Sequence, residues 1–410
     1  MLKKIGVEHL RVGMHIHELC GSWMEHPFWR TKFVVTDPMD IRQIVESGIK
    51  EVWIDDKKGI DVKGAAETRE EVDAEVDADL MQTAAATGTP LQIARPKLVP
   101  MTEEVKRAAK ICATAKSAVV SMFQEVRMGQ AISSEAAGEL VDEISSSVLR
   151  NPGALISLAR LKTADDYTYM HSVAVCALMV ALANQLGLDE KQTRDAGMAG
   201  LLHDLGKALM PMEVLNKPGK LTDDEFRIIK SHPVEGHRLL VEGGSVGPVV
   251  LDVCLHHHEK IDGSGYPERL TAEQISQFAK MGAVCDVYDA ITSNRPYKAG
   301  WDPAESIRKM TEWCDGHFDM RIFQAFVKSI GIYPVGSLVR LSSGRLGVVA
   351  EQSEKSLLTP RIKVFFSTKS MTYIPPELID LARAGNTEKI VAREDAEKWG
   401  VKNLDQYWLA

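Results

Sequence analysis

The residues of this chain that could do chemistry gather between His171 and Asp286. His203-Asp204, His232 and the triplet His256-His257-His258 lie between these two positions. Seven of the chain's 12 histidines fall in this segment, and they occur with carboxylates rather than with cysteines. Imidazole and carboxylate donors without thiolate suit a cation such as iron or manganese. The pattern therefore predicts a metal centre with nitrogen and oxygen ligands.

The dipeptide His203-Asp204 is the predicted middle of this centre. It ends an apolar helical run, so both side chains can reach one point while the helix stays buried. The two oxygens of an Asp carboxylate can bridge two cations about 3.5–4 Å apart, and paired cations lower the pKa of a bridging water enough to give hydroxide at neutral pH. The remaining ligands that could complete two metal shells are His171, His232, His257, His258 and Asp286.

Other histidines are not assigned to the centre. Three adjacent residues on a helix cannot all point the same way, so His256 is expected to pack beside the ligands. His237 and His317 are expected to be ordinary core or surface residues.

Helices are the elements that must position these ligands. Periodic apolar residues predict a helix opening at Thr102, a second over Ser133–Arg150, and further helices over 154–163, 166–187, 190–203, 222–240 and 246–257. Gly187 and Gly206 are expected helix stops. Helices that carry ligands on facing surfaces are the usual way to bury a metal pair, so the expected fold is mainly α, a helical metal-binding bundle.

Composition changes along the chain predict additional parts. Residues 1–60 are expected to form a small α/β or β-rich module, with strands over 33–36 and 51–55 and a helix over 38–48. Residues 61–100 are rich in Ala, Asp, Glu and Thr and predict an acidic flexible linker. The helical domain is expected over 101–332, with its metal-binding core over 160–330. Residues 333–410 predict a β-rich extension: a hairpin over 336–350, a third strand over 361–366 and a short helix over 395–401.

The overall composition narrows the class of protein. The formal charge of −8 argues against binding a nucleic acid polymer, which depends on clustered Lys and Arg. Six cysteines without a C-x-x-C pair are expected to be reduced thiols. The basic N-terminus has no apolar run behind it, and no 18-residue apolar stretch occurs, so neither a signal peptide nor a membrane span is expected. A cytoplasmic protein is predicted.

The motifs together resemble the HD-GYP family, bacterial phosphodiesterases of cyclic di-GMP within the HD superfamily. The resemblance covers about residues 160–330, and the first module resembles a small domain often found in front of HD-GYP units. The segments that carry the resemblance are His203-Asp204-Leu205-Gly206-Lys207, His232-Pro233-Val234-Glu235-Gly236, His257-His258-Glu259 through Gly265-Tyr266-Pro267, and Asp286 through Tyr297.

The resemblance implies roles for particular residues. The metal ligands would be His171, His203, Asp204, His232, His257, His258 and Asp286, with Asp204 bridging. Lys207 would lie near the scissile phosphate, where a cation neutralises developing charge. Tyr266 would line the substrate pocket, while Arg295 and Lys298 would hold phosphate oxygens.

One position departs from part of the family. Members that hold a third metal carry a Glu four residues before the first histidine, and this chain has Tyr167 there. Tyrosine is a poor ligand for that role, so two divalent metal ions, iron or manganese, are expected. Because the third metal is linked to cleavage beyond the linear dinucleotide, the product is expected to be pGpG, and further conversion to GMP stays open.

The predicted function is hydrolysis of cyclic di-GMP through a hydroxide that bridges the two metals. Two alternatives stay open. The chain could be a cyclic di-GMP receptor or scaffold with little turnover, docking signalling proteins through the Gly265-Tyr266-Pro267 loop. It could instead be an HD hydrolase of another phosphorylated nucleotide, such as a different cyclic dinucleotide or a guanosine tetraphosphate. A homodimer is also left open.

Overall fold

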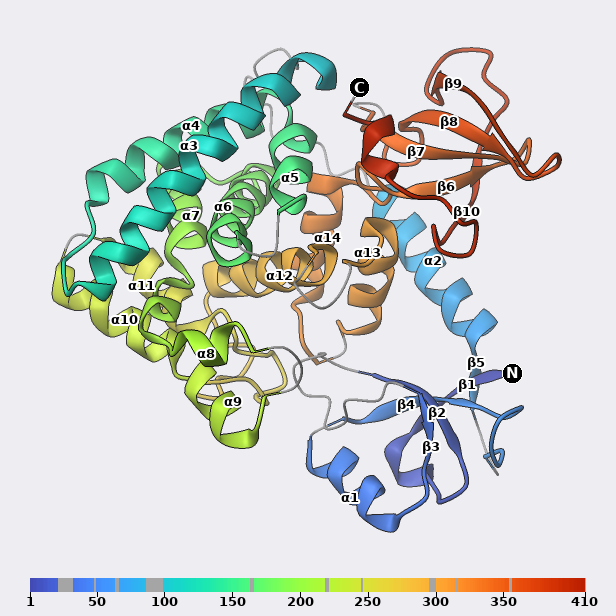
Figure 1. Cartoon of the computed structure of the whole chain (residues 1–410), viewed down its shortest axis with the longest axis horizontal. Coiled ribbons are helices and arrows are strands. Elements are labelled where there is room, and N and C mark those ends of the chain that lie inside the picture. Colours follow the sequence, from blue (N-terminus) through green and yellow to red (C-terminus); the bar gives the residue numbers. More distant parts are fainter. Residues whose placement is uncertain are drawn as a thin grey trace. The chain divides into compact units, whose positions relative to one another are not determined.

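The computed structural model divides the chain into two compact units, Met1–Gln82 and Thr83–Ala410 (Figure 1). The structure describes residues 1–20, 32–47, 49–62, 66–85, 99–162, 166–217, 221–244, 246–294, 300–314, 316–353 and 356–409. The mainly helical fold predicted from the sequence, with a small α/β part before it and a β-rich part after it, is confirmed.

The first unit is built on a five-stranded antiparallel sheet in the order β3-β2-β4-β1-β5. The strands are β1 (Leu2–Gly6), β2 (His15–Leu19), β3 (Phe33–Val34), β4 (Glu51–Asp55) and β5 (Glu67–Thr68). Helix α1 (Pro38–Glu46) begins at Asp37, whose side chain accepts the Met39 N–H in a capping box. Ile44 of α1 packs with the buried sheet residues Ile16 and Ile54. The predicted β3, α1 and β4 are confirmed, whereas β1, β2 and β5 were not predicted.

The acidic segment expected to be a flexible linker contains a helix, so that prediction is wrong for part of its length. Helix α2 covers Arg69–Ala85. Val72, Val76 and Leu80 are buried and recur every four residues, which places them on one narrow stripe of the helix. That stripe gives the segment a reason to be helical despite its charge. The rest of the linker prediction, residues 86–98, lies outside the described residues.

The helices of the second unit form one helical body (Figure 1). They are α3 (Met101–Arg127), α4 (Ser134–Arg150), α5 (Pro152–Arg160), α6 (Tyr167–Gln185), α7 (Glu190–Leu202), α8 (Met212–Leu215), α9 (Asp223–Ile229), α10 (His232–Gly243), α11 (Pro248–His256), α12 (Gln277–Thr292), α13 (Pro303–Glu312) and α14 (Met320–Ile330), with a short 3-10 helix η3 (Leu205–Leu209) after α7. Helix α4 begins after Ser133 and ends at Arg150, as predicted. The expected stop at Gly187 is confirmed by its left-handed backbone, with φ of +73°.

Two predicted helix boundaries are wrong. Helix α3 begins at Met101 rather than at a Thr102 cap, and the Met101 N–H donates to Glu351 Oε1 at 2.9 Å, so a distant carboxylate caps the helix. The single helix predicted over 222–240 is two helices, α9 and α10, because Pro233 has no N–H to continue a ladder. The restart puts His232 at the first position of α10.

Helix α6 is the centre of the bundle. Every residue from Met170 to Ala183 is buried, so the helix has no solvent-facing side along that length. Among the described residues it is the one helix whose length and composition would also suit a membrane span, but 78% of the window concerned is buried within the protein. The length and apolar composition of α6 are therefore those of a buried core helix.

The C-terminal part of the second unit is a five-stranded antiparallel sheet in the order β10-β6-β7-β8-β9. The strands are β6 (Leu338–Leu341), β7 (Arg345–Glu351), β8 (Arg361–Ser367), β9 (Thr372–Asp380) and β10 (Ile390–Arg393). The predicted hairpin and third strand are confirmed as β6, β7 and β8. The Leu338 N–H donates to Asp302 Oδ2 at 3.0 Å, which ties the sheet to the start of α13. The finer division into a domain over 101–332 and an extension over 333–410 stays a prediction.

The helix predicted over 395–401 is wrong. This segment forms turns around Glu394, whose carboxylate accepts the Trp399 indole N–H at 2.8 Å and pairs with Lys398. A short 3-10 helix, η4 (Leu404–Tyr407), follows instead.

Candidate metal centre

The seven predicted ligands converge in the core of the helical body. His171 lies on α6, His203 directly follows α7, Asp204 precedes η3, His232 begins α10, His257 and His258 follow α11, and Asp286 lies on α12. Six of the seven are buried, and the His258 side chain is 9% exposed. Residues separated by more than a hundred positions thus share one interior site.

Glycines allow the supporting elements to approach closely enough. A Cβ on Gly200 would lie 2.9 Å from the Cα of Cys176, so only glycine lets α7 cross α6 at the contact that brings His203 to His171. A Cβ on Gly206 would lie 2.0 Å from the carbonyl oxygen of His232. Gly206 was predicted to be a helix stop, but it lies inside η3, and what it provides is this close contact with α10.

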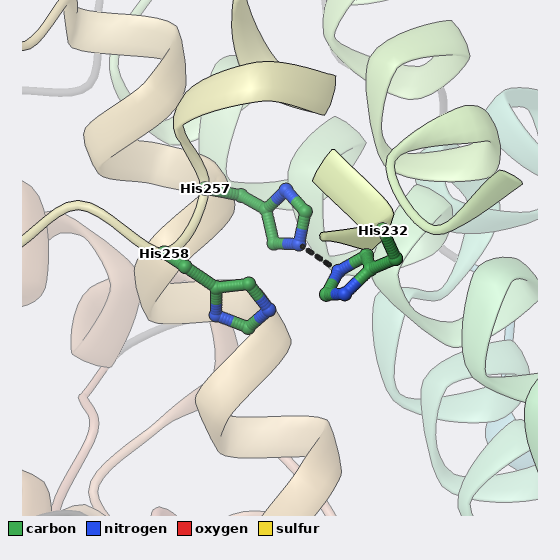
Figure 2. Close-up of side chains that lie close together, drawn as sticks. All are labelled: His232, His257 and His258. Atoms are coloured by element: carbon green, nitrogen blue, oxygen red, sulfur yellow. Dashed lines mark hydrogen bonds between the residues drawn. The ribbon is translucent and has the colours of Figure 1, made fainter. Parts of the chain in front are cut away.

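The donor atoms of the ligands form two clusters and a third group, His203, Asp204 and His257, that joins them. The first, called the His171 cluster, consists of His171, His203 and Asp286. The second, called the His232 cluster, consists of His232, His257 and His258 (Figure 2). Within each cluster the ligand atoms lie within 4.8 Å of one another. Such groupings match what a cation needs from a buried protein site.

Asp204 lies between the two clusters. Its Oδ2 is 3.4 Å from His171 Nε2 and 3.5 Å from His203 Nε2. Its Oδ1 is 3.1 Å from His232 Nε2 and 3.8 Å from His257 Nε2. One carboxylate oxygen therefore faces each cluster, as a bridging ligand must.

The hydrogen bonds on the far side of the imidazoles determine which ring nitrogen faces the centre. Backbone carbonyl oxygens accept from Nδ1 of three rings: Gly200 from His203 at 2.8 Å, Ile229 from His232 at 2.7 Å, and Val253 from His257 at 3.0 Å. In a neutral imidazole only one nitrogen carries a proton, so Nε2 of each ring presents a lone pair to the interior.

These lone pairs face one another. The Nε2 atoms of His232 and His257 are 3.3 Å apart (Figure 2), and those of His203 and His171 are also 3.3 Å apart. A hydrogen bond across such a pair would require one ring to carry two protons. Asp204 Oδ1 is buried and receives no hydrogen bond from the described residues. Converging lone pairs and an unsatisfied carboxylate oxygen fit cations held between them.

The protonation states of His257, His258 and Asp204 suit metal binding. Burial, reinforced by the neighbouring His203 and His232, lowers the pKa of His257 to about 3. Burial and His257 lower the pKa of His258 well below its ordinary value. Burial opposes ionisation of Asp204, but Lys207 and His203 outweigh it and hold the pKa of that carboxyl well below its ordinary range. Neutral imidazoles beside an ionised carboxylate are the forms that bind cations.

Lys207 and Tyr266 lie at the rim of this centre. The Lys207 ammonium is 2.5 Å from Asp204 Oδ2, and its side chain is 21% exposed, so it extends from the buried carboxylate towards solvent. The Tyr266 ring stacks on His258 with ring centroids 4.7 Å apart. That Lys207 and Tyr266 contact substrate stays a prediction. Arg295 and Lys298, the other predicted contacts, lie outside the described residues.

His256 contacts two carboxylates that are not among the predicted ligands. Its Nδ1 lies 2.8 Å from Asp252 Oδ1, and its Nε2 lies 3.3 Å from Glu268 Oε2. His317 stacks on Phe318 in the core, in agreement with the structural role expected for it.

Several residues around the centre were not found from the sequence. Lys230 lies with its ammonium 4.9 Å from the centroid of the Tyr266 ring. The buried Glu259 carboxylate accepts the backbone N–H groups of Glu268, Arg269 and Leu270, which holds the loop after His258. Asp289 and Lys162 lie behind His171. The sequence signal for Asp289 is its spacing of one turn from Asp286 on α12.

The fold and the site define an HD-type metal-binding helical bundle. A family model described as "HD domain" matches residues 149–322, and one described as "Domain of unknown function (DUF3391)" matches residues 2–137. The cyclic di-GMP phosphodiesterase PA4108 of Pseudomonas aeruginosa is 57% identical over 409 residues, which cover 100% of this chain and 96% of that protein. The chain belongs to the HD-GYP family, and the resemblance stated from the motifs is confirmed.

Other relatives match less than half of the chain. The cyclic di-GMP phosphodiesterase response regulator RpfG of Xanthomonas campestris pv. campestris is 39% identical over 42% of this chain and 47% of that protein. The 3'3'-cGAMP-specific phosphodiesterase 1 of Vibrio cholerae is 36% identical over 40% of this chain and 38% of that protein.

Proposed function

We propose that this chain is a metal-dependent phosphodiesterase that hydrolyses cyclic di-GMP. The observation that carries the proposal is the position of Asp204, with one oxygen facing each of two clusters of imidazole donors. Similarity over the full length of this chain to a cyclic di-GMP phosphodiesterase supports the choice of substrate.

We further propose that the centre holds two divalent cations, one at each cluster. The seven ligands are His171, His203, Asp204, His232, His257, His258 and Asp286. Nitrogen and oxygen donors favour iron or manganese. The nearby Cys254 thiol is buried, which raises its pKa, so it is not available as a thiolate ligand. When bound, the cations supply Lewis acidity towards the phosphoryl group and lower the pKa of water at the site.

The chain's own side chains bind and orient the substrate. Lys207 is proposed to donate a hydrogen bond to a phosphoryl oxygen, because its ammonium already lies beside Asp204 and its stem extends to solvent. Tyr266 is proposed to form a wall of the pocket against which a base or ribose packs, since its ring stacks on His258. Arg295 and Lys298 remain proposed phosphate contacts, carried over from the resemblance.

Tyr167 supports a two-metal site rather than a three-metal site. Its ring stacks on His171 with an interplanar angle of 7° and centroids 5.9 Å apart. An aromatic ring in this position packs against the ligand and adds no carboxylate for a further cation. The proposed product is therefore linear pGpG, with conversion to GMP left for the assay to decide.

The test is turnover of cyclic di-GMP by iron-loaded or manganese-loaded protein under reducing conditions, beside the Asp204→Asn variant. Wild-type protein is expected to release pGpG. The variant is expected to lose about a thousandfold in kcat, because it replaces one of the two bridging oxygens by an NH2 group and removes the negative charge shared by both cations. Arg194→Gln, which alters a surface ion pair with Asp142, is the control that should retain activity. Wild-type protein that binds the dinucleotide without hydrolysing it would refute the enzyme and favour the receptor alternative.

The cyclic dinucleotide 3'3'-cGAMP should be tested as a second substrate, because a relative of this chain is named as specific for it. Competition between cyclic di-GMP and 3'3'-cGAMP at equal concentrations gives the ratio of the two kcat/KM values. We propose that cyclic di-GMP is preferred. We also propose a cytoplasmic location. Docking of signalling proteins through the Gly265-Tyr266-Pro267 loop and formation of a homodimer both stay predictions from the sequence.

A further inference from the structure

A buried ion pair lies directly behind His171. The Lys162 side chain is fully buried, and its ammonium contacts Asp289 Oδ2. The same oxygen lies 2.6 Å from His171 Nδ1. The other oxygen, Oδ1, accepts the Ser293 hydroxyl at 3.0 Å. A single carboxylate oxygen is therefore shared between an ammonium and the ring of a proposed metal ligand.

An aromatic ring also holds this arrangement. The Lys162 ammonium lies 5.1 Å from the centroid of the Tyr167 ring, and that ring is parallel to His171. A cation over a ring face is attracted by the ring quadrupole. Lys162 therefore contacts both Asp289 and Tyr167, the two residues that lie against the His171 ring.

The charges of Lys162 and Asp289 give the pair a role beyond orienting the His171 ring. A carboxylate that accepts from the far nitrogen of a metal-bound imidazole raises the donor strength of that imidazole. Asp289 alone would do this and would add a third negative charge to the surroundings of the His171 cluster, beside Asp204 and Asp286. The buried ammonium of Lys162 cancels that charge while leaving the hydrogen bond to His171 in place. Among the residues that the structure describes, no equivalent pair supports the rings of His203, His232 and His257, whose Nδ1 atoms lie within hydrogen-bonding distance of neutral backbone carbonyls.

We propose that Lys162 and Asp289 act as one charge-balanced unit that orients His171 and sets the cation affinity of the His171 cluster, without acting on the His232 cluster. This inference rests on the proposed two-cation site. Lys162 and Asp289 are positioning residues, because they act through His171 and not on substrate.

The test is a double-mutant cycle read out as cation affinity. Crystals of wild type, Asp289→Asn, Lys162→Gln and the double variant are equilibrated with rising concentrations of manganese(II), and anomalous scattering gives the occupancy at each cluster. Asp289→Asn leaves the ammonium unbalanced beside His171 and is expected to weaken binding at the His171 cluster by about 10–100-fold. The double variant carries a neutral amide pair and is expected to recover affinity to within about threefold of wild type.

The single lysine variants separate charge from structure. Lys162→Arg keeps the charge and is expected to keep the affinity of wild type, whereas Lys162→Gln leaves an unbalanced carboxylate and is expected to bind manganese(II) at least as tightly as wild type. Lys309→Gln is the matched control, because Lys309 is also a buried lysine of the helical body, 3.5 Å from Glu312. It should leave both affinities unchanged.

Three results would overturn the inference. A double variant as weak as Asp289→Asn would mean that the carboxylate acts alone. A Lys162→Arg variant as weak as Asp289→Asn would mean that position 162 is only structural. Equal losses at both clusters would mean a general disturbance of the fold. A wild-type protein that binds no cation would instead refute the proposed function itself, so the two failures are distinguishable.

Discussion

The buried carboxylate of Glu259 is predicted to hold the loop that carries Tyr266. Glu259 is 2% exposed. Its Oε1 accepts the N–H groups of Glu268 and Arg269 at 2.7 and 3.0 Å, and its Oε2 accepts the Leu270 N–H at 3.0 Å. At the other end of the loop, the Tyr266 N–H donates to the His258 carbonyl oxygen at 3.2 Å. The loop therefore closes on a single charged acceptor.

Glu259→Gln replaces one acceptor oxygen by an NH2 group. The Leu270 N–H would then face another donor, and the remaining hydrogen bonds would lose the assistance of the charge. A lost charge-assisted hydrogen bond together with an unsatisfied buried donor costs about 3 kcal/mol. Because every 1.4 kcal/mol is about tenfold in an equilibrium constant, the local opening of the loop should become about a hundredfold more frequent.

Two measurements check this expectation. Hydrogen exchange of the amides of residues 268–270 should accelerate by about a hundredfold, and the KM for cyclic di-GMP should rise, because Tyr266 is no longer held in its stacked position. The bound metal should remain, since none of the proposed ligands is changed. Glu268→Gln, at a side chain that is 53% exposed, is the control. Unchanged exchange together with an unchanged KM would refute the assignment of the loop's order to Glu259.

Three further predictions concern the fold and the rim of the site. Burial would raise the pKa of Glu104, but hydrogen bonds from Arg150 and Ser147 outweigh it and hold that pKa below its ordinary value. The ionised carboxylate therefore stabilises the fold above about pH 4.5, and this stabilisation is lost as the pH falls. Glu104→Gln should therefore lower the free energy of unfolding at pH 7 by about 2–4 kcal/mol, and this difference from wild type should shrink in acid. Denaturant titration at several pH values measures the difference, and a difference that does not change with pH would contradict the prediction. Lys230→Ala should raise KM by about tenfold with little change in kcat, because it removes a cation beside Tyr266. Arg227→Ala, at an exposed side chain, is the control and should leave KM unchanged. Steady-state kinetics of both variants test the prediction. Gly206→Ala should abolish or severely destabilise the fold, since the added Cβ would overlap the His232 carbonyl, and an unchanged melting temperature would contradict the close approach of η3 and α10.

The ligand set could be predicted from the sequence because its chemistry depends on residue type. Imidazoles and carboxylates that recur without cysteines around His203-Asp204 already indicate a nitrogen and oxygen metal centre. The place of His203-Asp204 at a helix end indicated that both side chains could reach one point, and the bridging role of Asp204 was implied by the family resemblance. The structure places Asp204 between the two clusters. The substrate contacts depended on the family resemblance, because nothing in the spacing of Lys207 or Tyr266 indicates a phosphate.

The supporting residues could not be predicted in the same way. Lys162 and Lys230 are single lysines whose roles depend on which helix lies beside them, and that information is tertiary. Helix α12 gave no periodic signal because it is buried on almost all sides, from Ala279 to Thr292. The helix in the acidic segment was missed because a stripe of three apolar residues is weak beside so many charges.

The most direct test of the whole account is to locate the cations. Manganese-loaded protein, crystallised and measured at the manganese absorption edge, should show two anomalous peaks about 3.5–4 Å apart. One should lie among His171, His203 and Asp286, the other among His232, His257 and His258, with Asp204 between them. A single peak, or two peaks at separate places that do not share Asp204, would contradict the proposed two-cation centre.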